Sequence, residues 1–320
     1  MPFVASTIVP IFILIAVGYT IARSKILPTS AADGLSAFVF VVAMPLLLFR
    51  TIATAEFGEA SPLLLWAAYF SAVAVVFGLG ILAGRRIGAM DRRSSVIAGV
   101  AASFSNIVLV GVPVTERAFG RPGLDVIALL LAVHLPVMAT ASTLLMERAA
   151  YRDDRAAGIG DGAFRPLPVL KRVGRSLAKN PLIIGIVAGI IVRLTGVPLV
   201  GPLGDVVLSL AGTAGPLALV TLGLSLSKYG IGRDLAVPSI VAALALLVQP
   251  AVVALFAWAL GLPPLWLTIA VIAAACPSGV NAYLFALFFK VDATLSATSI
   301  VATTVLSAAT LSLWLVWLTG

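Results

Sequence analysis

Two apolar stretches, SFSNIVLVGVPV at residues 103–114 and AACPSGVNAYLFAL at residues 274–287, decide how this 320-residue chain folds. Each resembles a membrane-spanning segment, but it contains helix breakers and an amide side chain. Proline removes a backbone donor and crowds the carbonyl four residues earlier, and glycine lets the chain unwind. In lipid, backbone groups freed in this way are tolerated only against protein or a water-filled cavity. The stretches therefore predict two broken transmembrane helices beside a cavity.

The composition is that of a polytopic membrane protein. Apolar residues make up 61% of the chain and charged residues 11%, whereas soluble domains carry about 25% charged residues. Ten spans of roughly 20 residues would use about two thirds of the chain, so no separate soluble enzyme domain fits. The apolar N-terminal run, residues 2–22, follows no charged segment and is interpreted as the first span, not a signal peptide.

Ten apolar runs are predicted to form transmembrane helices in an all-α fold. The runs are 3–22, 33–49, 62–84, 95–115, 124–146, 181–195, 203–226, 236–260, 265–289 and 294–319. The two broken stretches fall in the fourth and ninth runs. At 1.5 Å per residue, Asn106 and Pro277 each lie roughly 18 Å into their runs, near the middle of the bilayer.

The distribution of basic residues predicts the orientation. Alternate loops carry 17 Lys and Arg residues, and the loops on the other side carry 4. Basic loops stay in the cytoplasm, so both termini are expected outside the inner (plasma) membrane. Because the basic residues flank apolar runs, the net charge of +8 does not indicate a nucleic-acid partner.

The longest polar stretch, residues 147–180, separates two halves of the chain. Its mixture of acids and bases favours a solvated cytoplasmic linker, and a basic segment in contact with anionic lipid is the alternative. The halves, residues 1–146 and 181–320, repeat at a spacing of 171 residues. The matched pairs are Pro10 with Pro181, Gly18 with Gly189, and Pro45 with Pro216. Five spans per half require an inverted second half, which is typical of transporters with a site at the midplane.

The candidate substrate-binding groups are broken backbone, amides and hydroxyls, since the acidic and basic residues of the apolar runs lie near the ends of the runs. Each break alone is most simply a kink with a packing amide, but two breaks in equivalent helices favour a binding site. The candidate substrate-binding residues are Ser105, Asn106, Gly111, Pro113, Pro277, Ser278, Gly279 and Asn281.

Three other polar residues have competing interpretations. His134, in the fifth run, is a candidate for proton coupling, although a neutral packing histidine is the favoured alternative. Gln249, before Pro250, either faces the cavity or bonds a neighbour. The single cysteine, Cys276, excludes an intramolecular disulfide and a cysteine-rich metal site, and we expect neither a metal nor a cofactor.

Several motifs spread along the chain resemble the auxin efflux carrier family and its bacterial members. They are GYTIARSKILPTSAADGLSAFVFVVAMPLLLF (18–49), SNIVLVGVPV (105–114), KNPLIIGIVAGI (179–190), AGPLALVTLGLSL (214–226), PSGVNAYLFAL (277–287) and ATSIVATTVLS (297–307). The resemblance implies ten helices in two inverted repeats with helices 4 and 9 crossing, as in bile-acid symporters. It also implies a scaffold of helices 1, 2, 6 and 7, a mobile domain of helices 3–5 and 8–10, and homodimers. Val108 departs from the glycine that members often have after the asparagine.

A secondary transporter is the function that these features favour. The resemblance implies elevator-type transport of a small organic anion such as malonate, malate or an auxin-like acid. A channel or a membrane sensor is the alternative, and an intramembrane enzyme is disfavoured because the runs hold one histidine and no paired carboxylates at mid-span. No P-loop is present, and the sequence leaves open the substrate, the direction of transport and its coupling to protons or sodium.

Overall fold

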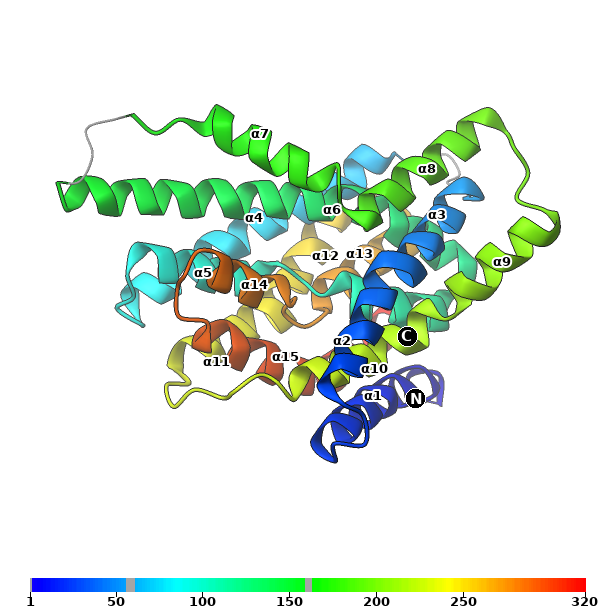
Figure 1. Cartoon of the computed structure of the whole chain (residues 1–320), viewed down its shortest axis with the longest axis horizontal. Helices are drawn as coiled ribbons and strands as arrows, with labels where there is room; N and C mark the ends of the chain where they lie inside the picture. Colours follow the sequence, from blue (N-terminus) through cyan, green and yellow to red (C-terminus); the bar gives the residue numbers. More distant parts are fainter. Residues whose placement is uncertain (1, 56–60, 159–162) are drawn as a thin grey trace.

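The computed structural model describes residues 2–55, 61–158 and 163–320, which form a bundle of helices (Figure 1). The α-helices are α1 (Pro2–Arg23), α2 (Thr29–Phe38), α3 (Met44–Ala53), α4 (Pro62–Arg86), α5 (Arg92–Ser103), α6 (Val112–Ala156), α7 (Pro166–Leu177), α8 (Pro181–Thr195), α9 (Gly201–Gly212), α10 (Ala214–Leu226), α11 (Ala236–Ala243), α12 (Gln249–Ala259), α13 (Pro264–Ala275), α14 (Asn281–Phe288) and α15 (Thr294–Thr319). Three π-helical turns are η1 (Val39–Ala43), η2 (Ile107–Gly111) and η3 (Leu244–Val248). The prediction of an all-α membrane protein is confirmed.

Helix ends follow signals in the sequence. The Asp91 side chain accepts a hydrogen bond from the Ser94 N–H at the start of α5, and the Asn180 side chain accepts one from the Leu182 N–H at the start of α8. Such caps satisfy donors that have no partner within the helix. Gly196, with φ of 68°, ends α8 in the left-handed conformation that glycine adopts without strain.

Three prolines inside the apolar runs, Pro45, Pro113 and Pro250, come just after π-helical turns. Pro250 lies just after η3, and it cannot bond the carbonyl of Leu246 four residues earlier. The indole Nε1–H of Trp314 donates to that carbonyl at 2.9 Å. α15 therefore supplies the hydrogen bond that the proline removes.

Seven described helices are long and apolar enough to cross a membrane, or eight if the bent pair α7–α8 is one span. One of the seven, Ile107–Ala156, contains Gly120 with φ of 57° and ψ of −144°, which is not helical. A straight helix of 50 residues would measure about 75 Å, more than twice the hydrocarbon thickness. We therefore treat this segment as two helices that meet at Gly120.

Two helix pairs cross at glycines, and the crossings are equivalent in sequence. A Cβ added to Gly18 of α1 would overlap the Val220 carbonyl of α10, and one added to Gly189 of α8 would lie 2.6 Å from the Phe49 carbonyl of α3. Gly18 and Gly189 are 171 residues apart, as are Phe49 and Val220. Figure 1 shows α1 beside α10, and α3 beside α8. Both pairs depend on glycine for backbone contact.

The remaining helices pack mainly on one another. α4 contacts α5 and α12, α13 contacts α6, α12 and α15, and α11 contacts α15. Of the predicted linker 147–180, residues 159–162 lie outside the described part of the chain. The rest is mostly helical, because α6 continues to Ala156 and α7 lies alongside it (Figure 1).

Candidate functional site

The two broken helices, α5–η2 and α13–α14, meet where each is interrupted. The Asn106 N–H donates to the Pro277 carbonyl at 2.8 Å, and the Gly279 N–H donates to the Phe104 carbonyl at 2.7 Å. These bonds form an isolated antiparallel bridge. Backbone groups that the breaks free from helices are thus satisfied by the other break, as a buried position requires.

Serines at the bridge reinforce it reciprocally. The Ser105 hydroxyl donates to the Ala274 carbonyl at 3.3 Å, at the end of α13. The Ser278 hydroxyl donates to the Ala101 carbonyl at 2.6 Å, near the end of α5. Each serine satisfies a carbonyl near the C-terminal end of the opposite helix, where such groups lack partners. Gly279 is required here, because an added Cβ would lie 2.8 Å from the Phe104 carbonyl.

Gln249, the first residue of α12, holds the bridge from a third helix. Its Nε2 donates to the Ser103 carbonyl at 3.2 Å and lies 3.3 Å from the Ser105 hydroxyl. The Tyr69 hydroxyl of α4 lies next to Ser105 and Gln249. Of the two interpretations of Gln249, bonding to a neighbour is the one observed.

A cavity of about 280 Å³ lies beside the bridge, and we call it the crossover cavity. It is lined by Phe40, Leu48, Phe104, Ser105, Asn106, Ile107, Val108, Leu131, His134, Leu135, Asn180, Leu182, Ile183, Ile186, Val280, Asn281 and Leu284. Asn106 is 6% exposed, and its Oδ1 accepts the Leu109 N–H at 3.3 Å. Its Nδ2 has no hydrogen-bond partner within the described residues. Since Oδ1 serves the backbone, the unpartnered atom is a donor.

The crossover cavity favours an anion electrostatically, although its lining carries no formal positive charge. None of its described lining residues is Lys, Arg, Asp or Glu. Two half-helices begin at its wall, one at Ile107 and the other at Asn281. The first N–H groups of a helix lack internal partners and carry a partial positive charge. Helix N-termini therefore serve as anion sites in proteins.

His134 lies in the cavity wall inside an aromatic cluster. Its ring centroid is 5.1 Å from that of Phe104, 5.6 Å from that of Tyr69 and 6.3 Å from that of Phe70. It is buried and lies next to the backbone of Ser105. The aromatic rings surround it, and its predicted part in proton coupling stays a prediction.

The other candidate residues divide into two groups. The backbone of Pro277 and the buried Ser278 and Gly279 form the bridge. Gly111 lies under the neighbouring helix, since an added Cβ would be 3.2 Å from the Cys276 Sγ. Pro113 is outside the crossover cavity, and it lines a second one.

The second cavity also measures about 280 Å³. It is lined by Pro10, Ile11, Leu14, Pro113, Glu116, Arg117, Gly212, Gly215, Pro216 and Leu219. Unlike the crossover cavity, it contains a carboxylate and a guanidinium. The Glu116 carboxylate would lie 3.2 Å from a Cβ added to Gly215, and it is within electrostatic reach of Arg50.

Charged residues next to the second cavity hold the neighbouring helices. The Arg117 Nε donates to the Ser6 carbonyl of α1 at 2.8 Å. The Arg121 guanidinium donates to the Thr54 carbonyl just after α3. We call Glu116, Arg117 and Arg121 the latch, because they connect α6 to helices α1, α3 and α10.

A family model described as "Membrane transport protein" matches residues 3–315. The chain belongs to this family. It is the auxin efflux carrier family that the motifs predicted, so that prediction is confirmed. Multiple apolar helices and the family together identify a multi-pass membrane transporter.

Two relatives of this auxin efflux carrier family member carry transporter names. A protein of Methanothermobacter thermautotrophicus, named "Uncharacterized transporter", is 28% identical over 96% of this chain and 96% of its own length. A protein of Rhizobium meliloti, named "Putative malonate transporter", is 26% identical over 98% of this chain and 95% of its own length. These names, like the family's, describe transporters and not enzymes.

Sequence reasoning missed two residues of this family member's site, Tyr69 and Asn180. Tyr69 is fully buried in α4 beside the bridge, and Asn180 lines the crossover cavity while it caps α8. A polar side chain inside an apolar run is a signal for the first. For Asn180 the only signal was Pro181, since Asn before Pro commonly starts a helix.

Proposed function

We propose that this transporter carries a small organic anion, a carboxylate or dicarboxylate such as malonate or malate, or an auxin-like acid. The observation that carries the proposal is the buried Asn106 amide, whose Nδ2 is an unpartnered donor at the wall of the crossover cavity. Drug-sized pockets measure roughly 300–1,000 Å³, so a cavity of about 280 Å³ suits a small substrate. The relative from Rhizobium meliloti is named a putative malonate transporter, and malonate is a small substrate of this kind.

The substrate carboxylate would accept hydrogen bonds from neutral donors. Asn106 Nδ2 supplies one and Asn281 a second, and the partial positive charge at the N-termini of the half-helices adds electrostatic attraction. Each neutral hydrogen bond contributes about 0.5–1.5 kcal/mol net, or about two- to tenfold in affinity. Moderate affinity suits a carrier, because the substrate must also leave.

An architecture of ten spans in two inverted repeats is part of the proposal. With Gly120 as a boundary and the breaks at residues 104–106 and 276–280 counted inside spans, the described helices other than α7 group into ten spans. The equivalent contacts of Gly18 with Val220 and Gly189 with Phe49 support the repeat. An odd number of spans per repeat then requires inversion.

The grouping of contacts supports alternating access by an elevator movement. In this proposal α1, α2–α3, α8 and α9–α10 form a scaffold that also mediates a homodimer, and the other membrane helices move with the bridge. The crossover cavity lies between the groups, with Leu48 and Ile186 on the scaffold side and Asn106 and Asn281 on the moving side. Movement of the moving group would carry the substrate across.

We further propose an inner-membrane location with both termini outside. The 17 to 4 distribution of basic residues supports it. A cysteine introduced at the exposed Ala157, after α6, should resist impermeant thiol reagents in intact cells and react after permeabilisation. Labelling in intact cells would contradict the orientation.

Uptake of labelled malonate and a panel of carboxylates into proteoliposomes tests the function. Wild-type uptake should saturate and show counterflow, and Asn106→Ala should raise the KM about two- to tenfold. Ser142→Ala is the matched control, because Ser142 is buried, lacks a partner among the described residues and lies outside the cavity. Flux that never saturates would indicate a channel, and a wild-type KM in both Asn106→Ala and Asn281→Ala would exclude this site.

A further inference from the structure

The C-terminal turns of α6 present a basic face beyond the apolar part of the helix. Arg148, Tyr151, Arg152 and Arg155 have the spacing i, i+3, i+4 and i+7, which puts them on one side of the helix. Together with Arg92 and Phe164 they line a cavity of about 590 Å³, which we call the arginine pocket. The rings of Tyr151 and Phe164 lie 6.1 Å apart and form its aromatic wall.

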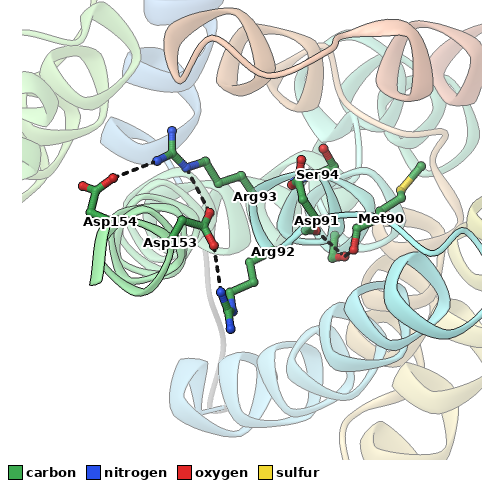
Figure 2. Close-up of polar contacts among 8 residues, drawn as sticks. Met90, Asp91, Arg92, Arg93, Ser94, Asp153 and Asp154 are labelled. Carbon is green, nitrogen blue, oxygen red and sulfur yellow. Dashed lines mark hydrogen bonds and ion pairs between the residues drawn. The ribbon is translucent and has the colours of Figure 1, made fainter. Parts of the chain in front are cut away.

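The nearby acids pair with basic residues other than Arg148, Arg152 and Arg155. Asp153 pairs with Arg92 at 3.0 Å and with Arg93 at 3.3 Å, and Asp154 lies 3.6 Å from Arg93 (Figure 2). These pairs join α6 to the start of α5. Glu147 pairs with Arg172 of α7.

The remaining arginines of α6 have no such partner. No ion pair in the described part of the chain involves Arg148, Arg152 or Arg155. Like charges one helical turn apart repel one another, so their alignment destabilises the isolated helix. An anion in the pocket would remove this repulsion.

The position and chemistry of the pocket specify the kind of anion. Guanidinium groups bind phosphate through paired N–H donors, better than a lysine does. Arg148 follows the apolar run that ends at residue 146, and Arg155 lies about 10 Å further along the helix axis. That distance exceeds the thickness of one lipid headgroup layer, which is roughly 5–7 Å, so the pocket extends from the headgroup layer to its aqueous edge.

We propose that the arginine pocket binds a phosphate-bearing anion through Arg148, Arg152 and Arg155. Arg92, fixed by Asp153, forms the rim toward α5. The phosphate comes either from an anionic phospholipid headgroup or from a soluble phosphate compound, and the contacts are the same for both. Bound anion would tie the end of α6 to the start of α5, which leads directly into the bridge.

Thermal unfolding of purified full-length protein tests the proposal at constant ionic strength. One arm titrates phosphatidylglycerol against phosphatidylcholine, and the other titrates inorganic phosphate and pyrophosphate against chloride. The variant R148Q/R152Q/R155Q is compared with K171Q/R175Q/K179Q, which removes three exposed positive charges from the adjacent α7 region. We expect the half-saturating concentration of the effective anion to rise about tenfold or more in the first variant only, since each basic residue at an anionic surface strengthens binding.

The outcomes separate the sources and can overturn the site. A response to phosphatidylglycerol alone assigns a headgroup, and a response to phosphate or pyrophosphate alone assigns a soluble ligand. R148K/R152K/R155K retains charge without the guanidinium fork, so it should bind about threefold more weakly than wild type. An equal effect in both glutamine triples, or no anion response in wild type, would overturn the proposal. Should the first triple not fold, R152Q against R175Q gives the same comparison.

Discussion

The crossover cavity and the second cavity have the same volume, about 280 Å³ each, and opposite chemistry. Their walls use equivalent residues of the two halves, since Leu48 and Leu219 are 171 residues apart, as are Ile11 and Leu182. One cavity presents neutral amides and helix N-termini, and the other presents Glu116 and Arg117. The repeated backbone therefore makes two similar spaces, and a few side chains give them different chemistry.

The two cavities also differ in the contacts that close them. Beside the second cavity, the latch connects α6 to three helices through charged side chains. The crossover cavity is bounded by apolar contacts and by the amides. These neutral groups release a bound anion at little cost in free energy. We infer that the crossover cavity binds the substrate and that the second cavity must open when the moving group shifts.

The largest expected effect comes from placing a charge in the crossover cavity. Asn106→Asp would set a carboxylate against the substrate carboxylate, and two like charges 4 Å apart repel by about 4 kcal/mol at an effective dielectric constant of about 20. The KM for uptake should rise at least about a hundredfold. Glu116→Gln in the second cavity should leave KM within about twofold of wild type. Comparable changes in both variants would show that the cavities do not differ in function.

The next effect tests whether the two glycine crossings are equivalent. Gly18→Val and Gly189→Val should each lower the free energy of unfolding by about 1–3 kcal/mol or more, because the added atoms meet backbone carbonyls. Gly78→Val is the control, since nothing lies within 4 Å of its added Cβ. Denaturation in detergent measures the change. A loss in only one of the two variants would break the equivalence of the halves.

A smaller effect is expected from the latch. Removing both guanidinium contacts in Arg117→Gln/Arg121→Gln should speed labelling of a Leu219→Cys probe in the second cavity about five- to tenfold, since a hydrogen bond to a charged group contributes about 1.5–3 kcal/mol before exposure reduces it. The probe reports opening, because Leu219 lines the cavity and is 3% exposed. The native Cys276 is buried, and Arg175→Gln is the control. Unchanged labelling would mean that these contacts do not hold the cavity closed.

The smallest effect distinguishes the two amides. Asn281 is only half-buried, so water replaces part of its hydrogen bond to substrate. Asn281→Ala should therefore raise KM about twofold, less than Asn106→Ala does. Uptake kinetics of both variants in the same proteoliposomes measure the ratio. A larger effect at Asn281 would place the substrate nearer α14 than η2.

The sequence predicted the breaks because helix interruption is a local property. Clusters of proline, glycine and asparagine at residues 106–113 and 277–281 weaken a helix through effects on the nearby backbone, and the apolar runs and basic loops follow directly from the cost of burying charge in lipid. The family was equally accessible, since its motifs are continuous segments. Residues whose role depends on another helix, such as Tyr69, were not predicted.

What the sequence by itself determined is the all-α membrane class, the family and the position of both breaks. Only the tertiary structure decided that the breaks bond to each other, that Ser105 and Ser278 satisfy each other's helices, and that Pro113 lines a different cavity from Asn106. The physical reason is the distance along the chain over which each effect acts. Backbone interruption and hydropathy act within a few residues, whereas the partner of a freed carbonyl lies about 170 residues away and is chosen by packing.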